Sequence, residues 1–155
     1  IRLDIFGTNH SDVARSCNSL GIYYVTNNQY DKGIEHYEKA LKIRLDIFGT
    51  NHLDVANSYH NLGISYENNN QYDKAIKHYK KALKIRLGIF GTNHLDVANS
   101  YDNLGDSYYS NNQYDKATEH REKALKIINK LLRDRIDLLM IPIGIWEYHS
   151  KTKKK

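Results

Sequence analysis

Histidine recurs along this 155-residue chain at a constant interval, and histidine can bind metals or transfer protons. A zinc ion needs about four ligands at ~2.0–2.3 Å. Equivalent residues of stacked helical units lie on the order of 10 Å apart, which is one helix diameter. The pattern therefore predicts no metal site, and we interpret these histidines as residues of unit junctions and surfaces. They form two sets with a spacing of 42: His10, His52 and His94, and His36, His78 and His120.

Repeated aspartates follow the first set of histidines by two residues. They stand where helices are expected to begin, and a carboxylate there interacts favourably with the helix dipole. No Ser, Cys or Lys nucleophile recurs beside a partnered base, which covalent catalysis would require. The sequence predicts no catalytic residue, no cofactor and no enzyme activity. The aspartates are Asp12, Asp54 and Asp96.

The elements that position these residues form a repeat. The nonapeptide FGTNHLDVA stands at 48–56 and again at 90–98, and 6–14 differs from it at one residue. The interval of 42 holds until about residue 128, and such self-similarity indicates a repeat architecture. We divide the chain into the end of a truncated preceding repeat (1–7), three repeats (8–49, 50–91 and 92–133) and a final segment (134–155).

Each repeat has the pattern of two helices. In the second repeat Val55, Tyr59 and Leu62 follow the spacing of one helical face, which predicts a helix over 53–68. A second apolar periodicity predicts a helix over 72–90. Across the chain the helices are expected at 11–26, 30–48, 53–68, 72–90, 95–110 and 114–132, so the predicted fold class is all-α.

Local signals mark the helix ends. Asn51 and Asp54 have the spacing of a capping box. The run from Asn68 to Gln71 predicts a tight turn, because asparagine tolerates the left-handed conformation that closes a helix. Gly91 is the expected C-terminal cap of the second helix.

Six residues of the second repeat fall at the spacing of the tetratricopeptide consensus: Leu62, Gly63, Tyr66, Ala75, Tyr79 and Ala82. With its 42-residue period and the pattern G-x-x-H-x-D-V-A, the chain resembles tetratricopeptide repeats of the kinesin light chain type. The resemblance implies a right-handed superhelical solenoid of stacked antiparallel hairpins. The chain departs from this family directly after the repeated histidine. Proline is common at that position in the family, whereas this chain has Ser11, Leu53 and Leu95.

The resemblance also implies a concave groove, lined by first helices, that binds extended peptides or partner helices. A carboxamide donates and accepts, so a row of asparagines can bind a peptide backbone. We expect these side chains to face solvent in the free protein. The candidate groove residues are Asn57, His60, Asn61, Ile64, Asn68, Asn99, Asp102, Asn103 and Asp106.

The distribution of charged residues limits the classes of partner that we expect. The formal net charge is +5, of which the last five residues supply four. Lysines line the second helices, but interspersed glutamates dilute them, so we interpret this side as a solvated outer face. Most tyrosines are expected in the core, which argues against nucleic acid. Glu67, Asp102 and Asp106 against a single Arg15 favour a neutral or basic peptide over an acidic one.

The remaining predictions concern compartment and ends. One cysteine, Cys17, cannot form an internal disulfide, which fits a reducing, cytoplasmic location, and we expect it to be buried as a small hydrophobe. No stretch approaches the roughly 20 apolar residues of a membrane span, which argues against a membrane partner. We expect 134–140 to extend or follow the last helix and to cover its exposed apolar face, and 149–155 to be disordered.

The predicted function is that of a protein–protein interaction scaffold or adaptor, which holds a segment of a partner in its groove. The alternative is a regulatory repeat array within a larger signalling or nucleotide-binding protein. The full-length sequence would separate the two, because fold analogy alone cannot identify the host.

Overall fold

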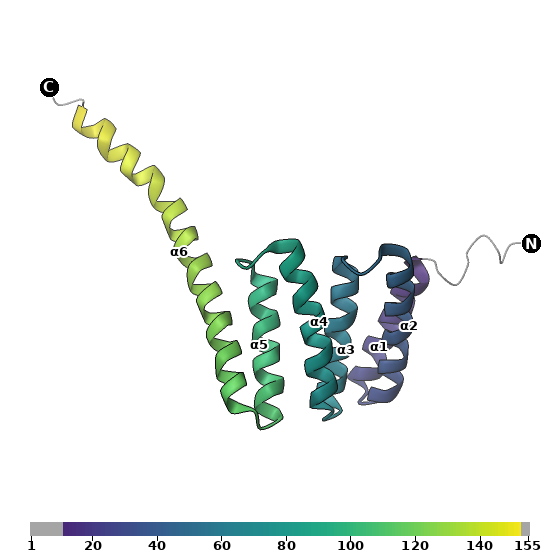
Figure 1. The fold of residues 1–155 in the computed structure, drawn as a ribbon. Coiled ribbons are helices and arrows are strands. Elements are labelled where there is room, and N and C mark those ends of the chain that lie inside the picture. The colour runs from purple at the N-terminus through teal and green to yellow at the C-terminus, as the bar shows by residue number, and fades with distance from the viewer. Residues whose placement is uncertain (1–10, 153–155) are drawn as a thin grey trace, which may run out of the picture.

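The computed structural model describes residues 11–152, with side chains described as far as residue 139. Within this range the chain forms six helices and no strand, so the all-α prediction is confirmed. Figure 1 shows the three helix pairs side by side in chain order, with the last helix extending far beyond the others. They are α1 (Ser11–Thr26), α2 (Tyr30–Phe48), α3 (Leu53–Asn68), α4 (Tyr72–Phe90), α5 (Leu95–Ser110) and α6 (Tyr114–Thr152).

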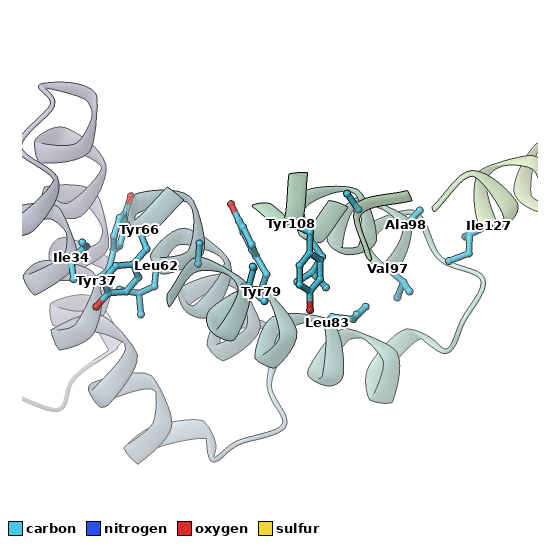
Figure 2. Close-up of a cluster of buried hydrophobic side chains, with 14 residues drawn as sticks. Ile34, Tyr37, Leu62, Tyr66, Tyr79, Leu83, Val97, Ala98, Tyr108 and Ile127 are labelled. Atoms are coloured by element: carbon cyan, nitrogen blue, oxygen red, sulfur yellow. The ribbon is translucent and has the colours of Figure 1, made fainter. Parts of the chain in front are cut away.

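The helices pack as three hairpins that stack on one another. The first and second helix of each hairpin are in contact, and α2 also packs on α3 and α4 on α5. One cluster of buried side chains runs through all three hairpins (Figure 2), and Leu62 and Leu104 within it are completely buried. The predicted solenoid is therefore the observed architecture.

Close approach within a hairpin depends on a glycine. A Cβ atom added to Gly63 would lie 2.5 Å from the Tyr79 ring, so this position on α3 accepts no larger residue without displacing Tyr79 from the core. Ala75 and Ala82 on α4 are also buried. The expectation that small residues let the two helices of a hairpin approach is confirmed.

The turns within the hairpins use asparagine in the left-handed region. Asn28, Asn70 and Asn112 have φ of 60°, 56° and 60°. After Asn70 the amide of Gln71 donates to the carbonyl of Tyr66 at 2.8 Å, which closes the end of α3. Gly91 caps α4 with φ of 74°. These predicted helix ends are confirmed.

Histidine, and not Asn51, caps the start of α3, so the capping-box prediction is wrong. His52 is the N-cap, and its Nδ1 accepts from the amide of Asp54 at 3.2 Å. The ring of His52 also stacks on Phe48, with centroids 4.1 Å apart. His94 repeats both interactions at the start of α5. An imidazole nitrogen here replaces the usual oxygen acceptor, because the flat ring can also pack on the end of the preceding helix.

The last helix differs from the prediction. It does not end near Leu132 but continues to Thr152, so 149–152 are helical and 153–155 lie outside the described residues. Ile136, Leu138 and Leu139 are 57%, 68% and 67% exposed, and the main packing partner of α6 is α5. The segment therefore extends the last helix, which is one of the two predicted arrangements, but it does not cover an apolar face. Residues 1–10, with the predicted end of a preceding repeat and His10, also lie outside the described residues.

Burial in the first hairpin and among the tyrosines is less complete than expected. Cys17 is only partly buried. Its counterpart Tyr59 packs in a cluster with residues of α2, whereas α1 contacts no earlier described helix. Four tyrosines are buried, but three of those described are more than half exposed. The buried ones are Tyr37, Tyr66, Tyr79 and Tyr108, and the exposed ones are Tyr23, Tyr109 and Tyr114.

We expect Asn70→Ala to destabilise the protein by about 1–2 kcal/mol, because a Cβ-bearing residue without a local hydrogen bond disfavours the left-handed region. Asn70→Gly is the matched control and should cost no more than about 0.5 kcal/mol, since glycine adopts this region freely. Urea unfolding of the two variants measures the difference. Equal losses would show that the backbone conformation is not what Asn70 provides.

The exposed end of α6 gives a second prediction. Replacing Ile136, Leu138 and Leu139 together with glutamine should change the free energy of unfolding by less than about 0.5 kcal/mol, as for other surface changes. Leu104→Ala, in the core, should cost about 2–5 kcal/mol in the same urea titration. A loss above about 1 kcal/mol for the triple variant would indicate that the segment covers the array after all.

Candidate functional site

The nine predicted groove residues lie on two neighbouring first helices. Asn57, His60, Asn61, Ile64 and Asn68 recur at the spacing of one face of α3, and Asn99, Asp102, Asn103 and Asp106 do the same on α5. We call these nine residues the binding face. Four of them are half-buried, and the other five are exposed. The half-buried residues are Asn57, His60, Asn61 and Asn103.

Amide groups of the binding face connect successive first helices. Asn61 Nδ2 donates to Asn18 Oδ1 on α1 at 3.1 Å. One repeat later Asn103 Nδ2 lies 3.4 Å from His60 Nδ1, so α5 is joined to α3 in the same way. The expectation that these asparagines face solvent is therefore wrong for Asn61 and Asn103. They hold neighbouring hairpins together.

A buried arginine beneath the binding face is missing from the sequence prediction. Arg86 on α4 is only 6% exposed, and its Nη1 donates to Ser100 Oγ at 2.8 Å. Its Nη2 donates to Asn57 Oδ1 at 3.2 Å, which fixes the orientation of that amide. Burial lowers the pKa of Arg86.

The same joint occurs one repeat earlier, where Arg44 Nη1 donates to Ser58 Oγ at 2.6 Å. Both arginines are followed fourteen residues later by the serine that they bind. That recurrence was the available signal. The sequence alone does not indicate burial, because an arginine within a lysine-rich helix is expected at the surface.

Two of the acids expected to face a ligand are engaged within the protein. Glu67 accepts from Tyr79 Oη at 2.9 Å and from Ser107 Oγ at 2.9 Å, so it joins three helices. Asp106 pairs with Arg121 of α6 at 2.6 Å. Asp102 is exposed and forms no hydrogen bond with the described residues, so it is the acid most accessible to a ligand.

Histidine 60 is neutral at physiological pH. Burial and, to a smaller extent, the positive charge of Arg86 lower the pKa of His60 to about 4, although the carboxylate of Asp96 acts in the opposite direction. The neutral ring can share a hydrogen bond with Asn103, in a direction that depends on the tautomer. His60 therefore contributes an uncharged polar edge to the binding face.

The chemistry available on the binding face is hydrogen bonding. Asn61 and Asn103 each keep a side-chain carbonyl oxygen that accepts no hydrogen bond from the described residues, and Asn57 likewise keeps its amide hydrogens.

Over residues 11–139 no group of three or more His, Cys, Asp and Glu side chains is arranged to hold a metal ion. In the described part of the chain no helix has the length and apolar content to cross a membrane.

Comparison with known proteins shows the same repeat. A family model described as tetratricopeptide repeat matches residues 12–87 and, again, 66–130. No curated protein sequence matches the chain.

Solved structures share the fold at low sequence identity. BtubC (BKLC) from P. vanneervenii superposes with a TM-score of 0.75 at 24% identity, over 79% of this chain and 49% of that one. A putative kinesin light chain with nearly identical TPR-like repeats from Podospora anserina gives a TM-score of 0.73 at 23% identity, over 84% of this chain and 62% of that one. The chain thus spans about half and about three fifths of these proteins.

The lowered pKa of His60 predicts a pH dependence. As the pH falls from 6.5 to about 4, the unfolded chain binds a proton that folded His60 does not, so stability should fall by up to about 2–3 kcal/mol. His60→Asn should remove this loss and leave the stability at pH 7 within about 1 kcal/mol, because Asn18 already occupies the equivalent position and binds Asn61. Urea unfolding between pH 7 and 4.5 measures both effects.

His78 also has a pKa lowered by burial, so a smaller slope should remain in the variant. Identical pH profiles for the variant and the parent protein would show that His60 is not the group responsible.

Proposed function

We propose that this chain, which belongs to the tetratricopeptide repeat family, is a scaffold that binds an extended peptide or a helix of a partner protein along its binding face. Repeats of this family are generally protein–protein interaction modules and typically lack enzyme activity. The stacked hairpins place α3 beside α1 and α5 through their amide pairs, so a ligand lying across the first helices meets several repeats in turn.

One observation carries the proposal: the amides of the binding face are oriented by internal hydrogen bonds and still have a polar group to offer. Arg86 orients Asn57, Asn18 orients Asn61, and His60 orients Asn103. Groups held in position before binding lose less entropy when a ligand arrives. A row of fixed donors and acceptors suits a peptide main chain, which presents both kinds of group at regular spacing.

The charges of the first helices support a proposal for the charge of the ligand. Arg15 is the one Lys or Arg side chain on α1, α3 and α5, and it pairs with Asp12. Asp102 is exposed on the same side, and Asp106 is also exposed although it is paired. We therefore expect a neutral or basic ligand, because an acidic one would meet like charge.

The test is a selection of twelve-residue peptides from a randomised library displayed on phage, followed by titration. The double change Asn61→Ala, Asn103→Ala should weaken binding of a selected peptide about fivefold to a hundredfold, if each lost hydrogen bond contributes about 0.5–1.5 kcal/mol. Isothermal titration and a urea curve are recorded for each variant, because the same amides also join the hairpins.

Asn18→Ala is the matched control. It removes the internal partner of Asn61 and should lower stability, but it leaves the Asn61 amide in place, so affinity should fall less than in the double variant. Unchanged affinity of the double variant, or selection of predominantly acidic peptides that bind these asparagines, would refute the assignment of this face.

A further inference from the structure

The outward side of α4 carries five lysines and one acid. That acid, Asp73, lies in the first turn of the helix and accepts from Asn111 Nδ2 at 2.9 Å. Five exposed lysines lie within eleven residues, and their spacing places them on the side of the helix opposite to the buried Ala75, Tyr79 and Ala82. None of the five forms an ion pair with the described residues. We call them the lysine face: Lys74, Lys77, Lys80, Lys81 and Lys84.

The other two hairpins have three lysines and two glutamates at the same five positions. Where α4 has Lys77, α2 has Glu35 and α6 has Glu119. Glu35 pairs with Lys39 at 2.6 Å, and Glu119 pairs with Lys123 at 2.5 Å. Lys80 likewise stands where α2 and α6 have Glu38 and Glu122. The sequence interpretation of a lysine row diluted by glutamates therefore holds for α2 and α6 but not for α4.

Aromatic rings position several of these ammonium groups. Lys81 Nζ lies 5.0 Å from the ring centroid of Tyr59, and Lys74 Nζ lies 5.3 Å from that of Tyr66. Tyr66 donates its hydroxyl to Glu38, whereas the equivalent Tyr108 has Lys80 5.6 Å from its centroid. Cation–π contacts restrict flexible lysines before any ligand binds, which lowers the entropy cost of ordering them.

Carboxylates limit the lysine face on both sides. On one side, Glu38 of α2 accepts from the hydroxyl of Tyr66, whose ring also contacts Lys74. On the other side, Lys80 of α4 and Lys116 of α6 both lie 5.6 Å from the ring centroid of Tyr108. Beyond Lys116, α6 presents Glu119 and Glu122. The positive region is therefore about 15 Å long, the rise of ten helical residues, with acids to either side.

We propose that the lysine face binds a short acidic segment of a partner protein. A run of about four or five extended residues at ~3.3 Å each, or three turns of an acidic helix, fits within this length. A nucleic acid strand or an anionic membrane is longer or broader than the lysine face and would also meet the carboxylates of α2 and α6. This second site lies on α4, apart from the binding face on α3 and α5, and does not depend on the function proposed for that face.

The test replaces lysines with the residues that the flanking repeats already carry. Lys77→Glu with Lys80→Glu is compatible with the fold, because α2 and α6 have glutamate at both positions. Lys126→Glu with Lys130→Glu on α6 is the matched control, since it makes the same change in net charge at exposed positions away from the lysine face. The probe is a fluorescein-labelled peptide with five consecutive glutamates between Gly-Ser flanks.

Fluorescence anisotropy should show that the α4 variant binds the probe at least about tenfold more weakly than the parent, and the control less than about threefold more weakly, because contact charges outweigh distant ones. Asn61→Ala with Asn103→Ala should leave probe affinity unchanged, which separates this site from the binding face. Circular dichroism checks that the helix content of every variant is that of the parent.

Three outcomes would overturn the proposal. Equal losses in the α4 variant and in the control would mean that net charge alone attracts the probe. Loss of probe binding in the Asn61→Ala, Asn103→Ala variant would place the acidic peptide on the other face. Tighter binding of a twenty-nucleotide RNA or of phosphatidylserine vesicles, with the same dependence on Lys77 and Lys80, would assign the lysine face to nucleic acid or membrane.

Discussion

A single hairpin of this chain cannot cover its own apolar surface, and every other feature follows from the stacking that solves this problem. The second helix of one hairpin must accept the first helix of the next, as α2 accepts α3 and α4 accepts α5. At each of these joints an arginine bonds to a serine across the interface, and a histidine caps the incoming helix while it stacks on the outgoing phenylalanine. Hydrophobic burial thus supplies the attraction, and these polar contacts fix the register.

Stacking also separates the chemistry of the two helix types. First helices present amides and a few acids, and Arg15 is their one Lys or Arg side chain. Second helices present lysines on their outward side. The inner polar atoms are already arranged by neighbouring repeats, so the array offers an ordered surface rather than a flexible one. In the middle hairpin the outward side carries five lysines and a single acid, Asp73, so the charge on this side differs in sign from the acids of the first helices.

The sequence predicts what is local and periodic. Apolar spacing located five helices correctly, and the asparagine and glycine ends are where steric preference places them. The sequence predicts a last helix that ends near residue 132 or is extended to 140, because the repeat stops there. In the structure no residue before Thr152 ends the helix, Pro142 included. The binding face was only partly predictable: Asn18 pairs with Asn61 and His60 with Asn103 at a separation of 43 rather than 42. This difference of one residue depends on how far one first helix is displaced along its axis relative to the next. The repeat pattern of the sequence does not predict that displacement.

The two joints of the array carry the same nonapeptide, FGTNHLDVA, at 48–56 and 90–98. Each hairpin therefore meets a preceding and a following surface built from interchangeable parts. A gene segment of one period, duplicated or lost at such a joint, recreates the capped and stacked interface without any compensating change in the core. Whole hairpins are in this sense the unit of variation. The length of the helical array can therefore increase or decrease by one 42-residue hairpin at a time, and each added hairpin has the same surface side chains as its template.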